Sequence, residues 1–306
     1  NKMNLKNKKF IFIVNPKSGK LSKKKKIKLI SDCCPSKPDI VFTKDSQETS
    51  ILSAEAFKKD QIVVACGGDG TVNLVANQAI NHNGIMTILP LGRGNDFAKF
   101  IGINSFNQFK RMLINSTILK CEYLDLNFKN TKKICLTSVG VGLLSEAAYR
   151  ASKIPFFQGI LLYLVSALTS FINLKAHSYI VELDKIKVLN EKLAILVAAS
   201  TPFAGGGMHI APDALKYENK VNLLYAKKVS RIQAIGLLSK VMSGNHLEHP
   251  KVNNLHVNNC LIETNDKNFW APLVYGDGEH LGNLPVDIKK GQKRLKVLVA
   301  KNENSN

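Results

Sequence analysis

The chain has 306 residues, of which 45% are hydrophobic and 22% are charged. These fractions are typical of a globular protein and exclude a fully disordered chain, and the length suffices for two domains that each bury a core. The charge is unusual, because 43 Lys and Arg residues outnumber 23 Asp and Glu residues and give a formal net charge of +20. Such a chain attracts polyanions, so nucleotides, nucleic acids and anionic membrane surfaces are its candidate partners.

Up to Cys121, short runs rich in branched apolar residues alternate with helix-period runs. The short runs have the length and composition of buried parallel strands, and they cover residues 10–14, 40–43, 62–66 and 86–90. The segments between them are long enough for crossover helices, so we predict an α/β domain over residues 1–121 with an open, mostly parallel sheet. Ligands of such sheets gather at the carboxyl ends of the strands.

After residue 121 strand-like runs dominate, among them CLTSVGVG, LAILVAA and LKVLVA, with a helix-like stretch near residues 231–242. This pattern predicts a mainly antiparallel, sandwich-like β domain over residues 122–300, followed by a tail at residues 301–306. The lysine run of residues 23–26 falls on the first expected helix, where a solvated helix face is the expected explanation.

Two further features bear on location. The six cysteines are scattered without CxxC pairs, which is typical of reduced thiols in a cytoplasmic protein rather than of a zinc module or a disulfide scaffold. The apolar stretch of residues 154–174 has about the length of a membrane-spanning helix, but polar residues interrupt it. We therefore expect a mostly buried helix, or one docked at an interface, rather than a transmembrane anchor.

Three polar, glycine-containing loops each follow one of the expected parallel strands: NPKSG, GGDGTVN and LGRGND. In GGDGTVN, Gly67, Gly68 and Gly70 let the main chain approach a ligand closely. Periodic apolar residues from Val72 to Ile80 predict that a helix starts there. Because the N–H groups at a helix start favour an anion, this loop indicates a phosphate site.

The other two loops offer groups of the same kind. They supply a turn-forming proline, a hydroxyl, two cations and an amide, carried by Pro16, Ser18, Lys17, Arg93 and Asn95. A carboxylate such as Asp69 would repel bound phosphate unless a metal ion lay between them, which favours a magnesium nucleotide over bare phosphate. Each loop alone is also compatible with a simple structural turn.

The sequence resembles the diacylglycerol kinase catalytic-domain family, which includes bacterial soluble lipid kinases, sphingosine kinases and ceramide kinases. The resemblance is carried by NPKSG, GGDGTVN and PLGRGNDFAK in the first half and by GGGMHIAPDA and YGDGEHLG in the second. It implies an ATP site in the cleft between the domains, lined by Asn15, Ser18, Gly19, Thr43, Gly67, Gly68, Asp69, Gly70, Thr71 and Asn73. From the same loops we add Pro16, Lys17, Val72, Arg93 and Asn95 as nucleotide-binding candidates. It also implies that the catalytic base lies in Asp277 and Glu279, although a β-hairpin turn is the other interpretation of YGDGEH.

Two positions depart from the pattern of that family. Where relatives usually have Thr, this chain has Arg93, a larger cation that either holds a phosphate or obstructs the pocket. After APDA, relatives commonly have an Asp-Asp-Gly loop with a metal-binding aspartate, whereas this chain reads KYENKVNLL. Glu218 is the nearest carboxylate and a weak candidate for a structural Mg²⁺.

Together these features predict an ATP- and Mg²⁺-dependent lipid kinase that phosphorylates a lipid hydroxyl, first of all that of diacylglycerol to give phosphatidic acid. The first 60 residues contain 15 lysines and six acidic residues, so we expect a cytoplasmic enzyme that associates peripherally with the anionic inner face of the membrane. A homodimer is left open. The alternatives are a NAD kinase, which would share GGDGT, and a non-catalytic lipid- or nucleotide-binding relative. Nucleic acid is not an expected partner, because aromatic residues do not interleave with the basic runs.

Overall fold

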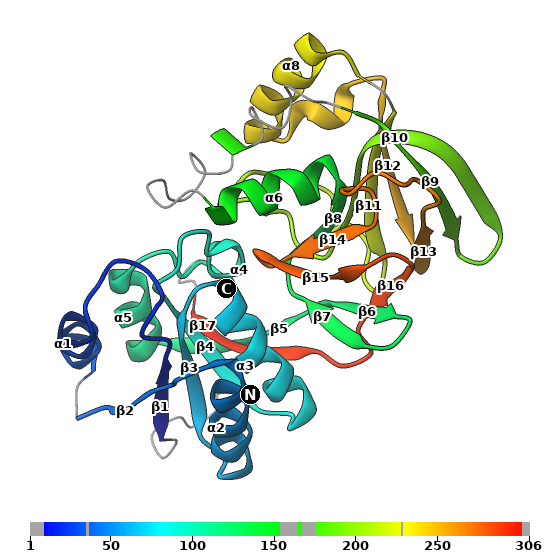
Figure 1. Ribbon diagram of the computed structural model, residues 1–306. Coiled ribbons are helices and arrows are strands. Elements are labelled where there is room, and N and C mark those ends of the chain that lie inside the picture. Colours follow the sequence, from blue (N-terminus) through cyan, green and yellow to red (C-terminus); the bar gives the residue numbers. More distant parts are fainter. Residues whose placement is uncertain (1–8, 35–36, 154–164, 167–174, 228, 302–306) are drawn as a thin grey trace. The chain divides into compact units, whose positions relative to one another are not determined.

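The computed structural model describes residues 9–34, 37–153, 165–166, 175–227 and 229–301. The chain divides into two compact units: unit 1 holds the described residues up to Cys121 and those from Lys293 onward, and unit 2 holds Glu122–Gln292. Each unit is built on its own sheet (Figure 1). The helix expected at residues 154–174 lies outside the described residues, except for 165–166. Among the helices that are described, none has the length and apolar character needed to cross a bilayer.

Unit 1 contains a six-stranded sheet with the strand order β2-β1-β3-β4-β17-β5. Neighbouring strands are parallel, except that β17 and β5 are antiparallel. Strand β3 is buried along its whole length and β1 is buried except at Phe10, as their branched apolar residues require. This confirms the predicted α/β domain with a mostly parallel sheet. The strands are β1 (Phe10–Val14), β2 (Asp39–Phe42), β3 (Ile62–Gly67), β4 (Ile85–Pro90), β5 (Ser116–Cys121) and β17 (Leu295–Ala300).

Helices cover the sheet of unit 1 on both faces. Helix α1 (Lys23–Cys33) packs beside α5 (Phe106–Ile114), and α2 (Ser46–Lys58) packs beside α3 (Asp69–Asn81). Figure 1 shows these two pairs on opposite sides of the sheet, and a short helix, α4 (Asp96–Phe100), follows β4. From β1 the chain continues to β2 at the edge of the sheet, whereas from β3 it continues to β4 on the opposite side. The order of the strands therefore reverses between β1 and β3, which is the topological switch point.

The last strand corrects the expected domain limits. The run LKVLVA was assigned to a second domain of residues 122–300, but β17 lies in the sheet of unit 1, between β4 and β5. Leu295 pairs with Cys121, and Val297 pairs with both Leu119 and Met86. The apolar side chains of this strand are buried in the core of unit 1, which local sequence cannot reveal. Unit 2 is therefore an insertion between two neighbouring strands of unit 1.

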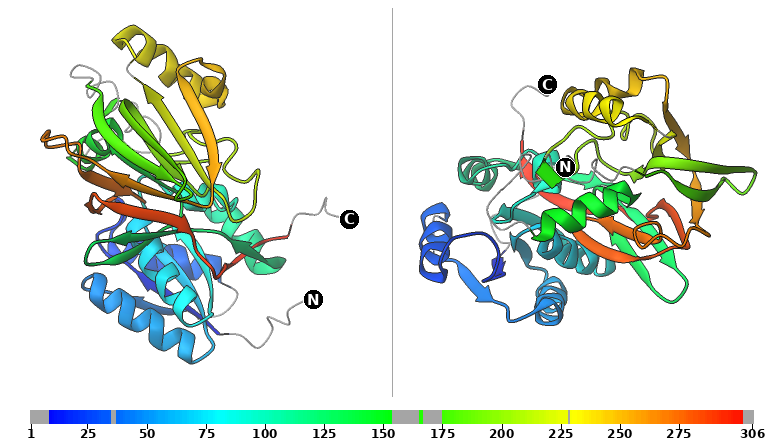
Figure 2. Two further views of the ribbon diagram at one scale, coloured as in Figure 1. Left: turned by 90° about the vertical axis from the view of Figure 1, so that its right-hand side faces the viewer. Right: turned by 45° about the horizontal axis from the view of Figure 1, so that its top comes forward.

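Unit 2 contains an 11-stranded sheet in which all described strand pairs are antiparallel, as predicted. Its central strand, β10 (Lys187–Ala199), pairs with β9 along its first half and with β8 and β11 along its second half. The register of β10 against β11 shifts between Leu193 and Ile195, which indicates a β-bulge. Figure 2 gives two further views of the strands. The other strands are β6 (Leu124–Phe128), β7 (Lys132–Cys135), β8 (Ser138–Gly142), β9 (His177–Leu183), β11 (Val221–Lys227), β12 (Val252–Val257), β13 (Asn259–Glu263), β14 (Leu273–Gly276), β15 (Glu279–Asn283) and β16 (Val286–Lys290).

The core of unit 2 follows from the alternation of its strands. In β9 every second residue is buried, so Tyr179, Val181 and Leu183 point to one face and meet apolar side chains of β10, β13 and β16. Helix α6 (Leu143–Lys153) packs on β8 and β14, and α8 (Arg231–Ser243) contributes a smaller apolar cluster. A short 3-10 helix, η2 (Asn245–Glu248), follows α8.

Candidate active site

Three loops of unit 1 meet at the carboxyl ends of β1, β3 and β4. We call them loop 1 (residues 15–19), loop 2 (residues 67–73) and loop 3 (residues 91–96). The Gly68 amide of loop 2 donates a hydrogen bond to Ser18 Oγ of loop 1 at 3.3 Å. Leu91 N of loop 3 donates to the carbonyl oxygen of Gly67 at 3.0 Å. Loop 2 is thus bonded to both of its neighbours, and loops 1 and 2 flank the switch point, where open α/β sheets bind their ligands.

Side chains reinforce the junction of loops 1 and 2. Asn15 Nδ2 donates to Thr71 Oγ1 at 3.3 Å, and Asn15 Oδ1 accepts a hydrogen bond from the Lys17 amide at 2.9 Å. Thr71 is buried, whereas Lys17 is exposed. The structure therefore brings Asn15, Ser18, Gly68 and Thr71 together as the sequence predicts, with Lys17 at the outer edge.

Loops 2 and 3 touch through glycine. A side chain on Gly92 would overlap the Cα of Gly68, so the two main chains can cross this closely only without a Cβ at that position. The Asp69 carboxylate spans the same junction and accepts hydrogen bonds from the amides of Asn95 at 2.9 Å and Asp96 at 3.0 Å. Asp69, predicted as part of the nucleotide site, thus also fixes the start of α4.

The first turn of α3 begins inside loop 2. Its N-cap is Gly68, which makes no side-chain capping bond, so the N–H groups of the first turn have no side-chain cap. Val72 does not share this role, although it was predicted as a nucleotide-binding residue. Its side chain is 3% exposed in the core, and its N–H donates to the carbonyl oxygen of Gly68 at 3.0 Å.

Four other predicted residues surround this junction. The Thr43 side chain is buried and accepts a hydrogen bond from Thr49 Oγ1 at 2.9 Å, so it faces α2. Arg93 and Asn73 are half-buried and have polar contacts. Asn95 adopts a left-handed conformation with φ of 57°, and its side chain bonds to the Gly92 main chain.

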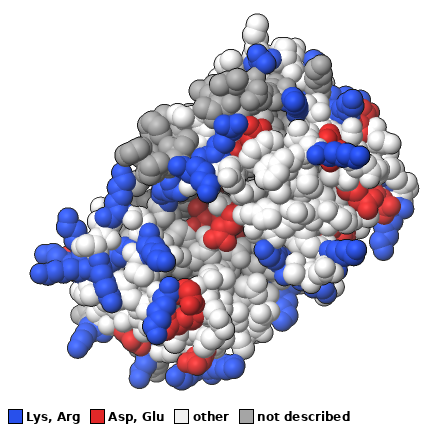
Figure 3. Space-filling model, in the orientation of Figure 1, with Lys and Arg blue, Asp and Glu red and all other residues white. Residues whose placement is uncertain are grey.

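Lys26 is a site residue that the sequence analysis missed. The prediction of a solvated face for residues 23–26 is wrong for this lysine, which is fully buried. Its Nζ donates to the carbonyl oxygens of Asn15 at 3.1 Å and Pro16 at 2.7 Å, and burial lowers its pKa. The sequence does contain a pattern that indicates its burial. Lys26, Ile30 and Cys33 follow helical spacing and form the buried face of α1. The rest of the run is exposed, and Figure 3 shows Lys and Arg side chains gathered over α1.

The two predicted catalytic carboxylates lie at a hairpin of unit 2. β14 and β15 are joined by Asp277 and Gly278, which both have positive φ, 47° and 76°, as a two-residue type I′ turn requires. The Asp277 carboxylate is buried and accepts hydrogen bonds from Leu136 N at 2.7 Å, Thr137 N at 3.1 Å and Thr137 Oγ1 at 2.7 Å. Thr137 could not be found from sequence, because it lies 140 residues away.

Glu279 is placed differently. It is exposed at the start of β15, and among the described residues no main-chain amide binds its carboxylate in the way that Asp277 is bound. Surrounding protein atoms remove part of its hydration and raise its pKa above the ordinary value of 4.5. The charge of Asp277 raises it further, and the charge of Lys133 opposes this. The hairpin therefore holds one carboxylate rigidly and presents the other as a basic group.

Glu218, the weak metal candidate, lies in an exposed loop. Within the described residues, no three His, Cys, Asp or Glu side chains are close enough to hold a metal ion. The loop is fastened in another way: Asn219 N donates to Glu122 Oε1 at 2.9 Å, and Glu122 Oε2 pairs with Lys290 Nζ at 3.0 Å. The Lys290 side chain is 2% exposed, so a buried ammonium group supplies a positive charge beside this loop.

Comparison with known proteins identifies the family. The family model described as the diacylglycerol kinase catalytic domain matches residues 9–123. The model described as the YegS C-terminal NAD kinase beta sandwich-like domain matches residues 137–299, more than half of the chain. The chain belongs to the diacylglycerol kinase family. The resemblance seen in the sequence motifs is thereby confirmed.

Individual members of the diacylglycerol kinase family match most of the chain at low identity. The diacylglycerol kinase of Bacillus subtilis (strain 168) is 23% identical over 258 residues, which cover 83% of this chain and 82% of that protein. The diacylglycerol kinase of Mycobacterium tuberculosis (strain CDC 1551 / Oshkosh) is 25% identical over 253 residues, covering 81% and 80%. A crystal structure of a putative diacylglycerol kinase from Bacillus anthracis str. Sterne shares the fold, with a TM-score of 0.76 over 97% of both chains at 18% identity.

Proposed function

We propose that the protein is an ATP-dependent lipid kinase, with diacylglycerol as the first candidate acceptor. The observation that carries the proposal is the junction of loops 1 and 2 at the switch point between β1 and β3, beside the start of α3, where the N-cap Gly68 makes no side-chain capping bond. Phosphate groups bind at such helix starts. Membership of the diacylglycerol kinase family and the names of the relatives support a lipid hydroxyl as the acceptor.

We assign the nucleotide phosphates to loops 1 to 3. The main-chain amides of loop 2 and the Ser18 hydroxyl would bind phosphate oxygens, and Arg93 would add a cation. When bound with the nucleotide, Mg²⁺ would neutralise phosphate charge. Asp69 is the carboxylate that loop 2 offers it, and the remaining ligands would be phosphate oxygens and water, because the described residues form no metal cage.

We assign the proton transfer to Glu279. The acceptor oxygen attacks the γ-phosphorus, the bond between that phosphorus and the oxygen bridging to the β-phosphate breaks, and ADP leaves. The proton of the hydroxyl passes to the Glu279 carboxylate, whose raised pKa makes it the stronger base. Asp277 acts as a positioning residue, because its carboxylate already accepts three hydrogen bonds.

The test is phosphate transfer from labelled ATP to diacylglycerol, phosphatidylglycerol, a sphingoid base and NAD in parallel. We expect a labelled lipid product, and transfer to NAD alone would overturn the proposal. Glu279→Gln should abolish transfer to the lipid, whereas Glu263→Gln, an exposed glutamate of β13, should not. Equal ATP turnover by wild type and Glu279→Gln would instead indicate a non-catalytic relative.

A NAD kinase is the second candidate, because the model that matches residues 137–299 describes an NAD kinase-like β sandwich. The two candidates differ in whether the acceptor is a membrane lipid or a water-soluble dinucleotide. The NAD arm of the assay therefore decides between them directly.

A further inference from the structure

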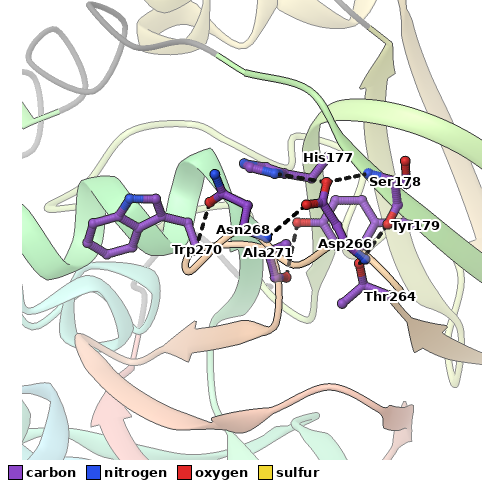
Figure 4. A network of polar contacts seen from close by, with 8 residues as sticks. All are labelled: His177, Ser178, Tyr179, Thr264, Asp266, Asn268, Trp270 and Ala271. Atoms are coloured by element: carbon purple, nitrogen blue, oxygen red, sulfur yellow. Dashed lines mark hydrogen bonds and ion pairs between the residues drawn. The ribbon is translucent and has the colours of Figure 1, made fainter.

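The loop between β13 and β14 is held to β9 by a network of polar contacts (Figure 4). The Asp266 carboxylate lies at its centre. It accepts hydrogen bonds from Ser178 N at 3.2 Å and Asn268 N at 2.9 Å, and it lies 3.3 Å from His177 Nδ1. The pKa of Asp266 is lowered, chiefly because the Asn268 amide binds its charged form.

Both ends of this loop are fastened as well. Thr264 Oγ1 donates to the carbonyl oxygen of Ser178 at 2.7 Å, and Tyr179 Oη donates to that of Ala271 at 3.2 Å. Asn268 Oδ1 accepts a hydrogen bond from Trp270 N at 3.0 Å. The main chain on either side of Phe269 is therefore fixed, and the position of that residue is set by the network.

The fixed loop presents aromatic rings to the surface. Phe269 is 68% exposed and its ring centre lies 5.0 Å from that of Trp270. The Trp270 ring in turn lies 5.3 Å from the ring of Tyr149 on α6, and Figure 4 shows it pointing away from the network toward that helix. We call Tyr149, Phe269 and Trp270 the aromatic patch. Exposed clusters of this kind mark surfaces that bind a partner.

Two exposed lysines lie beside the aromatic patch. Lys153 Nζ lies 5.4 Å from the Tyr149 ring centre, and Lys267 is exposed two residues before Phe269. Neither lysine forms an ion pair with a described residue, whereas Glu146, the acidic group of α6, is paired with Arg150 at 2.7 Å. Tyr and Trp rings beside lysines are the combination that occurs at the headgroup level of bilayers.

We propose that the aromatic patch docks unit 2 on an anionic bilayer. Phe269 and Trp270 would enter the boundary between headgroups and acyl chains, while Lys153 and Lys267 would contact lipid phosphate groups. The proposal rests on the proposed function in that a lipid acceptor resides in a membrane. The docking itself requires neither ATP nor Glu279, so the two proposals can fail separately.

The experiment uses Trp270, the only tryptophan of the chain, as its reporter. Without nucleotide, vesicles of phosphatidylcholine with phosphatidylglycerol should shift the tryptophan emission to shorter wavelength, and brominated acyl chains should quench it. Vesicles of phosphatidylcholine alone should do so more weakly. Phe269→Ser should weaken vesicle binding about tenfold. Lys153→Gln and Lys267→Gln should each weaken it about fivefold at low salt.

The matched control is Ile186→Ser. Ile186 is 89% exposed at the turn between β9 and β10, in the same unit, and its replacement should leave vesicle binding unchanged. Emission that stays unchanged and unquenched on anionic vesicles overturns the proposal, as does an equal loss in Ile186→Ser. A shift that depends on protein concentration without vesicles also overturns it, because a second copy would then cover the patch. If Phe269→Ser fails to fold, the two lysine variants decide.

The kinase assay separates the two proposals. With a short-chain diacylglycerol dissolved as monomers, Phe269→Ser should keep the wild-type rate, and Glu279→Gln should bind vesicles like the wild type. Loss of transfer to every acceptor with normal vesicle binding would defeat only the proposed function.

Discussion

The Lys26 ammonium group lies beneath loop 1 and donates to two successive carbonyl oxygens, those of Asn15 and Pro16. Because these two oxygens are bound to the ammonium group, the buried charge fixes the main-chain conformation of loop 1. Lys26→Met should therefore lower the free energy of unfolding by roughly 1.5–3 kcal/mol, the usual contribution of hydrogen bonds to a charged group. It should also weaken ADP binding measured by titration calorimetry.

Lys25→Met is the control for that variant, because Lys25 is exposed on the same helix. Replacing Lys25 should change neither the free energy of unfolding nor the affinity for ADP. Equal effects of the two substitutions would show that loop 1 does not depend on the buried ammonium group.

Glu279 makes the pH dependence of the reaction testable. Because its pKa is raised, the protonated and inactive form persists above the ordinary value of 4.5, and activity should rise with pH through the raised pKa. The positive charge of Lys133 lowers the pKa of Glu279 and so opposes the upward shift. Lys133→Met should therefore raise that pKa further and move the acidic limb of the kcat/KM profile to still higher pH. Lys132→Met, an exposed neighbour on β7, should leave the limb in place. A limb that moves equally in both variants, or in neither, would contradict the assignment of Glu279 as the base.

At the scale of elements, β16 is held by the buried ion pair of Lys290 with Glu122, and Lys290 Nζ also donates to Ser200 Oγ at 2.9 Å. Lys290→Met would remove the ammonium group that pairs with the Glu122 carboxylate, whose side chain is only 13% exposed. The free energy of unfolding in urea should fall by about 3–5 kcal/mol. Adding Glu122→Gln should recover part of that loss, because the uncompensated charge is then gone.

The matched comparison is Lys227→Met. Lys227 pairs with Glu191 at 2.8 Å, but both side chains are exposed, at 54% and 39%. A solvent-exposed pair of this kind contributes little to stability. If Lys290→Met lowers the free energy of unfolding no more than Lys227→Met does, burial does not make the Lys290–Glu122 pair more important for stability than an exposed pair.

The same elements show what the sequence can and cannot predict. The parallel strands and α3 were predictable because periodicity and glycine loops are local signals, and the loops follow strands that lie side by side. The motif that contains Asp277 and Glu279 was also visible in the sequence. Their different roles were not, because the hydrogen bonds that hold the Asp277 carboxylate come from Thr137 on a distant segment. The strand LKVLVA could not be assigned to the sheet of unit 1 from the sequence, because the strands that pair with it lie far away along the chain. Lys26 was misread because a run of like charges hid a helical period.

At the scale of the whole molecule, unit 2 is inserted between β5 and β17, and Leu295 pairs directly with Cys121. A fragment of residues 1–121 would lack the strand between β4 and β5 and should not unfold cooperatively in urea. Joining residues 9–121 to residues 293–301 through a short glycine-rich linker should restore a cooperative transition, because the two ends are already neighbours in the sheet. Cooperative unfolding of the fragment without β17 would contradict this.

This topology also sets the order of events during synthesis. The ribosome completes every strand of unit 2 before it makes β17, so the inserted unit can fold while its host still has a gap between β4 and β5. Until residue 300 has emerged, the nascent chain exposes two unpaired strand edges, which invite association with other chains. A stop codon shortly before residue 295 should therefore yield aggregated protein, even though all three glycine-containing loops and both carboxylates would be present.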